Sequence, residues 1–213
     1  MPIPPWLDAR WRPASTWLLH AVGLVPAAWY FYLGATGRIP GDAVKVFEHL
    51  LGLWALRFLL ATLAVTPLRD LAGINLTRYR RTLGLLAFWY VALHFLTYLT
   101  LDQNLNFPEI VKDIAERPFI TIGMACLVML LPLAVTSNNA AIRRLGARWR
   151  RLHMLVYPII LGGAFHYAMA VKTITFEPFL YLTLAILLVA YRLLRPTMLA
   201  RRKRRLATQR CTK

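Results

Sequence analysis

Long apolar runs separated by short polar links dominate this chain. Six runs approach the ~20 residues that a helix needs to cross a bilayer, at about residues 15–35, 48–67, 82–101, 118–136, 152–171 and 176–194. No series of alternating ten-residue strands indicates a barrel, so the backbone hydrogen bonds must close inside helices. The pattern predicts an all-α membrane protein with a bundle of six transmembrane helices.

Composition agrees with a membrane protein, because 58% of the 213 residues are hydrophobic and only 16% are charged. A soluble domain of this length is rarely so apolar. The links are short, so we expect one transmembrane domain over residues 1–195 and a basic tail over residues 196–213. The N-terminus lacks a short apolar region followed by a small-residue cleavage site, so the first span is expected to stay as an anchor.

The net charge of +17 comes from 26 Lys and Arg that are distributed asymmetrically. Twenty of them lie in the first, third, fifth and seventh exposed segments, and only five lie in the alternate segments. By the positive-inside rule, this asymmetry predicts that both termini are cytoplasmic. Basic residues that flank membrane spans favour contact with anionic lipid, so we expect membrane lipid and no nucleic acid as a partner.

Two histidines are predicted to lie at one depth on neighbouring helices. His166 follows His153 by 13 residues, which is roughly 20 Å along a helix, and His94 follows Arg80 by 14 residues. Two imidazoles at one level are the ligand set of a six-coordinate haem. The alternative is that they are hydrogen-bonded bundle residues or part of a proton path.

Small residues near these histidines are expected to leave room for a flat cofactor. They are Gly162, Gly163 and Ala164, which precede His166, and Gly84 on the other helix.

His153 and Arg80 begin the same two spans on the cytoplasmic side. On ideal helices Arg80 lies only ~40° from His94, whereas His153 lies ~140° from the deeper histidine of its own span. Pro158 and Gly162–Gly163 are expected to bend that span and alter the phase. An arginine is a poor iron ligand, but it suits a haem propionate, a flavin phosphate or a quinone oxygen. The sequence thus predicts a second, inner cofactor site with its occupant open.

Three further polar residues lie in predicted spans, namely His20, His49 and Arg57. A guanidinium inside a bilayer is costly and is normally paired, so Arg57 is expected to meet an acidic side chain or a haem propionate. His20 is expected to form a hydrogen bond within the bundle, and His49 is expected to lie at the membrane interface.

Several stretches carry a resemblance to a known family. They are LLHAVGLVPAAWY around His20, LRFLLATLAVTPLRD, RYRRTLGLLAFWYVALHFLTY from Arg78, RPFITIG, LAVTS, and LGARWRRLHMLVYPIILGGAFHYAMAVK from Leu145. The most specific pattern is basic-Trp-x-x-Leu-His-x-x-x-Tyr, which ends at Tyr157. Over nearly its whole length the chain resembles the ferric-reductase-like transmembrane family, and within it the haem-binding membrane subunits of bacterial periplasmic methionine sulfoxide reductase systems.

The resemblance implies a haem b protein of the bacterial inner membrane. Its electrons would come from the quinone pool or a cytosolic flavin reductase and go to a periplasmic molybdopterin subunit that repairs oxidised methionine in proteins. His94 and His166 match the family's outer haem ligands and His153 its inner ligand, whereas Arg80 stands where the wider family has a fourth histidine. One haem or two are therefore expected, and FMN is implied as well.

About 19 residues follow the sixth span, and the chain has no GxGxxG or P-loop pattern, so a nicotinamide or flavin domain is not expected. We therefore expect an electron-transfer subunit whose partner carries out the chemistry on methionine. Two other functions remain open. One is a b-type ferric or b561-like reductase, and the other is a small non-haem transporter that uses intramembrane His and Arg for its substrate or for protons.

Overall fold

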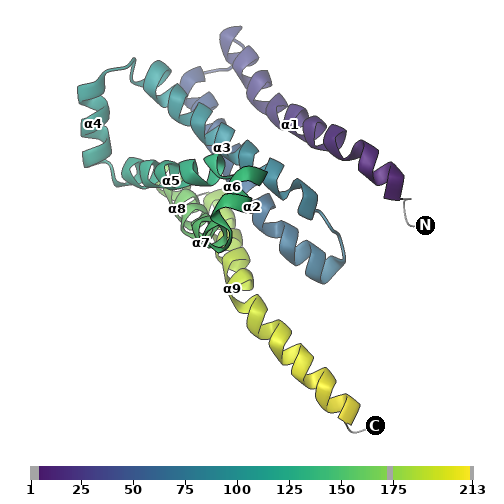
Figure 1. The fold of residues 1–213 in the computed structure, drawn as a ribbon. Coiled ribbons are helices and arrows are strands. Elements are labelled where there is room, and N and C mark those ends of the chain that lie inside the picture. Colours follow the sequence, from purple (N-terminus) through teal and green to yellow (C-terminus); the bar gives the residue numbers. More distant parts are fainter. Residues whose placement is uncertain (1–4, 172–174, 212–213) are drawn as a thin grey trace.

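A computed structural model describes the backbone of residues 5–171 and 175–211, and the side chains of residues 14–171, 175–198 and 200. Helices and turns make up the described residues, which contain no strand (Figure 1). The helices are α1 (Pro5–Ala35), α2 (Ala43–Ala72), α3 (Arg80–Thr97), α4 (Phe107–Glu116), α5 (Pro118–Val135), α6 (Asn139–Leu145), α7 (Ala147–His153), α8 (Val156–Ala170) and α9 (Phe176–Cys211). A 3₁₀ turn, Thr77–Tyr79, precedes α3, and a π-helical turn, Tyr98–Asp102, follows it.

Six helical stretches within the described residues are long and apolar enough to cross a membrane. They are Ala14–Ala35, Ala43–Ala72, Thr77–Asp102, Pro118–Val135, Ala147–Ala170 and Phe176–Met198. The prediction of a six-helix, all-α membrane protein is therefore confirmed.

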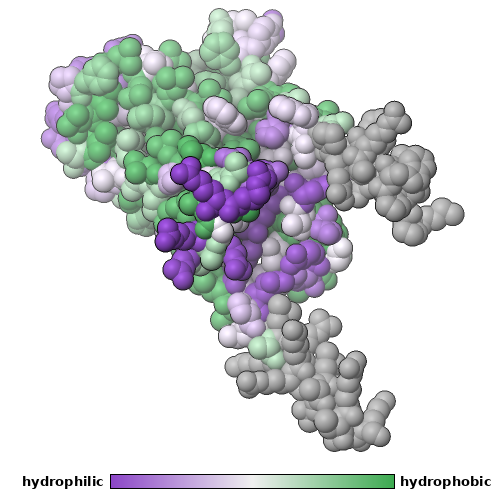
Figure 2. All heavy atoms as spheres, viewed as in Figure 1, coloured by the Kyte–Doolittle hydropathy of each residue, from purple (hydrophilic) through white to green (hydrophobic). Residues whose placement is uncertain are grey.

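Helix α2 is the central helix of the bundle. In the most apolar 18-residue stretch of α2, 56% of the residues are buried, whereas in the corresponding stretches of the other spans 11% to 33% are buried. The largest fully buried side chains come from α2, α3 and α8, and they are Leu51, Leu63, Leu86, Tyr90, Ile159 and Ile160. The other helices turn apolar side chains outward, as the broad hydrophobic surface in Figure 2 shows. Lipid would cover such a surface.

Helix α1 lies at the edge of the bundle, where Tyr90 of α3 forms hydrogen bonds with its backbone. The buried Tyr90 hydroxyl donates to the Gly23 carbonyl at 2.7 Å and accepts from the Ala27 amide at 3.2 Å. A Cβ at Gly23 would lie 2.6 Å from the side chain of Leu86. The absence of a side chain at Gly23 is thus what allows α1 to approach α3 closely.

The polar link between the third and fourth spans contains a helix, α4, which the sequence pattern did not predict. Its residue Asp113 is only 4% exposed. The Asp113 carboxylate accepts hydrogen bonds from Tyr98 and Gln103, each at 3.3 Å, and pairs with Arg117 at 3.1 Å. Because these contacts compensate the buried charge, α4 is fixed to the ends of the neighbouring spans.

The chain breaks its helical path directly after His153, where α7 ends and two turn residues precede α8. Tyr157 N–H donates to the Met154 carbonyl at 3.0 Å, a tighter step than the α-helical one. Pro158 lies in the first turn of α8, where a backbone N–H has no partner within the helix. Pro158 has no N–H to donate to the Met154 carbonyl, and its ring crowds that carbonyl, so the break at Met154 and Leu155 agrees with the expected effect of Pro158. Gly162–Gly163, in contrast, lie inside the continuous α8.

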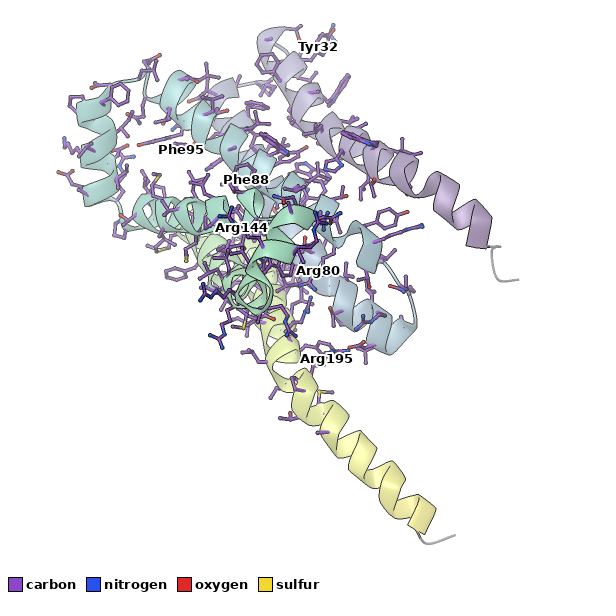
Figure 3. All side chains as sticks on the ribbon, in the orientation of Figure 1. Tyr32, Arg80, Phe88, Phe95, Arg144 and Arg195 are labelled. Atoms are coloured by element: carbon purple, nitrogen blue, oxygen red, sulfur yellow. The ribbon has the colours of Figure 1, made fainter. Side chains whose placement is uncertain are left out.

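Arginines gather at one end of the bundle, which we call the basic end. Figure 3 shows Arg80, Arg144 and Arg195 on the side where the termini lie, opposite α4. Hydrophilic residues also gather over α6 and α7 (Figure 2). At this end Asp70 of α2 binds Arg195 and accepts from Tyr191, both of α9. The basic end thus also joins the central helix to the last one.

Candidate functional site

The structure brings His94 of α3 and His166 of α8 together. Their ring centroids are 6.2 Å apart, and the ring planes are nearly perpendicular at 83°. Imidazole nitrogens bind transition metals at about 2 Å, so a metal held between two imidazoles separates their centroids by roughly 6 Å. The pair therefore has the spacing of two axial ligands, and the sequence-based expectation that the two histidines are level is confirmed.

A backbone carbonyl on the neighbouring helix orients His94. Its Nδ1 lies 2.9 Å from the Glu48 carbonyl oxygen of α2. Since a carbonyl only accepts, Nδ1 carries the proton and donates it, which leaves Nε2 with a free lone pair. Gly52, one turn after Glu48, lies against the ring, and a Cβ there would be 3.4 Å from two ring atoms.

His166 repeats this arrangement on the other pair of helices. Its Nδ1 donates to the Phe119 carbonyl of α5 at 2.6 Å. Gly123, one turn later, leaves the space that the ring uses, because a Cβ there would be 3.0 Å from two ring atoms. Hydrogen bonds of this kind fix the tautomer and the orientation of a metal-binding histidine and raise its basicity.

We call each pair of a carbonyl and a glycine four residues later an imidazole clamp. The two clamps are formed by Glu48 with Gly52 and by Phe119 with Gly123. Sequence reasoning missed both, although EHLLG and FITIG are visible in the chain. A glycine in an apolar helix signals close approach of another group, but the sequence does not show which group approaches.

The expected small-residue space is only partly present. A Cβ at Gly163 or at Gly84 would meet no atom within 4 Å, so both glycines border open space. In contrast, a Cβ at Gly162 would lie 2.7 Å from the Cys126 sulfur, and Ala164 is fully buried in the core. Gly163 lies one turn before His166, and therefore the open space adjoins the helix face that carries the histidine.

The two residues of the predicted inner pair lie within electrostatic range of each other. His153 stacks on Trp149 with ring centroids 3.9 Å apart, and its Nδ1 donates to the Trp149 carbonyl at 3.1 Å. Its Nε2 is buried and has no hydrogen-bond partner. Arg80, which Figure 3 shows at the basic end, is a charged residue near His153.

Arg57 meets polar partners on α9. Its Nε donates to the Tyr181 hydroxyl at 2.7 Å, and its Nη2 lies 3.4 Å from a Glu177 carboxylate oxygen. The guanidinium also lies 5.2 Å from the ring centroid of Trp54. Arg57 therefore meets an acidic side chain, which is one of the two partners expected for it.

Two further histidines, His20 and His49, were expected to bond within the bundle and to lie at the interface. The His20 Nδ1 is 2.9 Å from the Thr16 carbonyl of its own helix, α1. His49 is exposed, and its ring centroid is 5.4 Å from that of Tyr167. The local bond of His20 and the exposure of His49 agree with a bundle residue and an interfacial residue.

Comparison with known proteins adds to this geometry. Residues 15–164 match the family described as ferric reductase like transmembrane component. No match was found among solved structures.

Close relatives share one name, "Protein-methionine-sulfoxide reductase heme-binding subunit MsrQ". The protein of Rhizobium meliloti (strain 1021) is 61% identical over 206 residues, which cover 97% of this chain and 95% of the relative. That of Brucella ovis is 59% identical over 186 residues, covering 87% of this chain and 84% of the relative. The chain therefore belongs to the ferric-reductase-like transmembrane family, in the group of the relatives named MsrQ.

Proposed function

We propose that this protein is a haem b electron-transfer subunit of a methionine sulfoxide reductase system, with His94 and His166 as the axial ligands of one haem. The relatives carry "heme-binding subunit" in their name. The observation that carries the assignment is the histidine pair, whose rings are 6.2 Å apart with both Nδ1 atoms bound to carbonyls. Both Nε2 atoms are thereby available to a metal.

The donor set of the described residues fits haem better than a bare metal ion. No group of three or more His, Cys, Asp or Glu within them is close enough to hold a metal. A porphyrin brings its own four equatorial nitrogens and needs only two axial ligands from the protein. The open space beside Gly163 supplies room for a flat macrocycle next to His166.

Haem, when bound, supplies an iron that gains and loses one electron at a time. The chain supplies fixed geometry. Each imidazole is oriented by a clamp on a second helix, and the bundle keeps the pair inside the bilayer. Rigid, desolvated ligands keep the surroundings from reorganising when the charge changes. The protein's part is thus to hold both ligands in one tautomer and position.

The direction of electron flow follows from the proposed orientation. The basic end carries most of the arginines, so the positive-inside rule places it and both termini in the cytoplasm. The His94–His166 pair then lies toward the periplasm of a bacterial inner membrane. Electrons would enter from the quinone pool or a cytosolic flavin reductase and leave to a periplasmic molybdopterin-containing reductase subunit.

His153 and Arg80 belong to a second, inner site in this proposal. The His153 Nδ1 is bound to the Trp149 carbonyl, so its buried Nε2 is free to bind the iron of a second haem or to contact FMN. Arg80 remains a fixed cation beside it and suits an acidic group of either cofactor better than a metal.

A reaction of the reduced protein with candidate acceptors tests the function. The detergent-purified protein is reduced with dithionite without air, freed of excess reductant and mixed with the periplasmic reductase subunit and methionine sulfoxide. We expect two haems to be reoxidised for each methionine formed, because reduction of the sulfoxide takes two electrons and each haem supplies one.

Reoxidation by ferric citrate but not by the reductase subunit would instead support the ferric or b561-like reductase, which the family description favours as second candidate. A protein without haem would support the transporter.

A further inference from the structure

Arg192 of α9 is the most unusual charged residue at the basic end. Its Nε and Nη2 atoms are both buried, and neither has a hydrogen-bond partner. The Nε2 atom of His153 is in the same state. These three nitrogens are the only buried side-chain polar atoms without a partner in the described part of the chain.

The unpartnered groups lie in one electrostatic neighbourhood. Arg80 lies within electrostatic range of His153 and of Arg192, and Tyr157 lies within that range of both arginines. The four side chains come from α3, α7, α8 and α9. Helices from both halves of the sequence thus direct polar groups into one region.

No carboxylate of the described residues neutralises this region. The nearby acidic residue, Asp70, already pairs with Arg69 and Arg195 and accepts from Tyr191. Neither Arg80 nor Arg192 forms an ion pair within the described chain. Buried, unpaired cationic N–H groups are strongly unfavourable, so a bound anion would stabilise them.

The geometry of the free atoms indicates what kind of anion fits. Nε and Nη2 form one edge of the guanidinium, and that edge donates two parallel hydrogen bonds to two oxygens of a carboxylate or phosphate. A halide ion would use only part of this edge. The neighbouring Tyr157 hydroxyl and His153 Nε2 provide further polar contacts for a larger ligand.

We propose that Arg192, together with Arg80, binds a carboxylate or phosphate group of a ligand in the inner site, and that His153 Nε2 faces the same ligand. The inference rests on the proposed function and deepens it, because an inner cofactor must bring an acidic group that the two arginines can bind. A haem propionate, the FMN phosphate and an anionic lipid headgroup share this chemistry.

The test compares ligand content in Arg192→Gln, Arg192→Lys and wild type. The glutamine removes the charge and the two-donor edge, whereas the lysine keeps only the charge. Arg144→Gln is the matched control, because Arg144 is an exposed arginine of the basic end without an ion pair in the described chain. Each full-length protein is purified from haem-replete cells, and haem, flavin and phosphatidylglycerol are quantified per chain.

We expect one of the three ligands to fall about tenfold or more in Arg192→Gln, to fall less in Arg192→Lys, and to stay at the wild-type level in Arg144→Gln. The ligand that falls identifies the source of the anion. In a second arm, FMN and riboflavin are titrated into the purified proteins. If the source is FMN, Arg192→Gln weakens FMN binding and leaves riboflavin binding unchanged.

Wild-type levels of all three ligands in Arg192→Gln would overturn the proposal. The proposal would also be overturned if the wild-type protein contained one haem, no flavin and no phosphatidylglycerol, and if that haem were lost in His94→Ala. A failure of the haem proposal can be told apart from this outcome. In that case the wild-type protein itself would contain no haem, with or without the substitution of Arg192.

Discussion

At the scale of single residues, the two imidazole clamps decide what the histidines can do. A histidine in a bilayer could present either nitrogen to its surroundings, and only a bound Nδ1 leaves Nε2 as the ligand. In both clamps a carbonyl selects the tautomer, and a glycine one turn later lets the ring reach that carbonyl. The glycines are therefore positioning residues for the proposed haem.

Gly123→Ala tests this role directly. The new Cβ would lie 3.0 Å from two atoms of the His166 ring, so the ring must move away from the Phe119 carbonyl. We expect haem affinity to fall about tenfold, as for other changes beside a metal ligand, together with a shifted midpoint potential.

Gly52→Ala provides a milder comparison, because its Cβ would lie 3.4 Å from the His94 ring. We expect this variant to lose less haem affinity than Gly123→Ala. Haem content and redox titration measure both variants. Wild-type affinity and potential in Gly123→Ala would contradict the positioning role.

Gly163 gives a test of the cofactor space. A Cβ at this position meets no protein atom within 4 Å, so the haem-free protein should tolerate Gly163→Leu with an unchanged unfolding temperature. A macrocycle beside His166 would collide with the larger side chain, and haem content should fall to a small fraction of wild type. Full haem loading of Gly163→Leu, measured by pyridine haemochrome, would show that the cofactor lies elsewhere.

At the scale of the helices, the sequence predicts which segments span the membrane but not which helices are neighbours. The six spans follow from length and hydropathy alone, and the level of His94 and His166 follows from counting residues along two spans. The roles of Gly52 and Gly123 could not be predicted, because they depend on the pairing of α2 with α3 and of α5 with α8.

The sequence pattern missed one element and located another only roughly. The break after His153 lies one turn before Pro158, where a proline disrupts a helix, but the sequence did not show that the helix would end there. The helix α4 lies in a link that looks merely polar until its buried Asp113 is seen with its three partners. The position of α4 depends on these tertiary contacts, which local sequence preference does not reveal.

The attachment of α1 makes a prediction at this scale. Tyr90→Phe removes the hydroxyl that bonds to the Gly23 carbonyl and the Ala27 amide. We expect a loss of about 1 kcal/mol in the free energy of unfolding, measured by denaturation in mixed detergent. The haem spectrum should stay unchanged, because His94 and His166 are oriented by α2 and α5. A variant as stable as wild type would show that α1 is held by apolar packing alone.

At the scale of the whole molecule, the charge distribution defines two different ends. The basic end carries the unpartnered edge of Arg192 and the His153 site, and the opposite end carries α4 and is nearer to the His94–His166 pair. In the proposed orientation, these ends would receive electrons from the cytoplasmic side and deliver them on the periplasmic side.

Reporter fusions test that orientation. A green fluorescent protein fused after Lys213 should fluoresce, and an alkaline phosphatase at the same position should be inactive, because both report a cytoplasmic C-terminus. The same reporters placed after Asn106, at the start of α4, should give the opposite result. Active phosphatase at the C-terminus would reverse the proposed direction of electron flow.

The most direct test of the histidine pair is the visible spectrum of the detergent-purified protein, oxidised and dithionite-reduced, in wild type, His94→Ala, His166→Ala and His153→Ala. We predict sharp reduced b-type bands in wild type that vanish in His94→Ala and in His166→Ala and only weaken in His153→Ala. A colourless wild type from haem-replete cells, or full bands in both His94→Ala and His166→Ala, would contradict haem ligation by this pair.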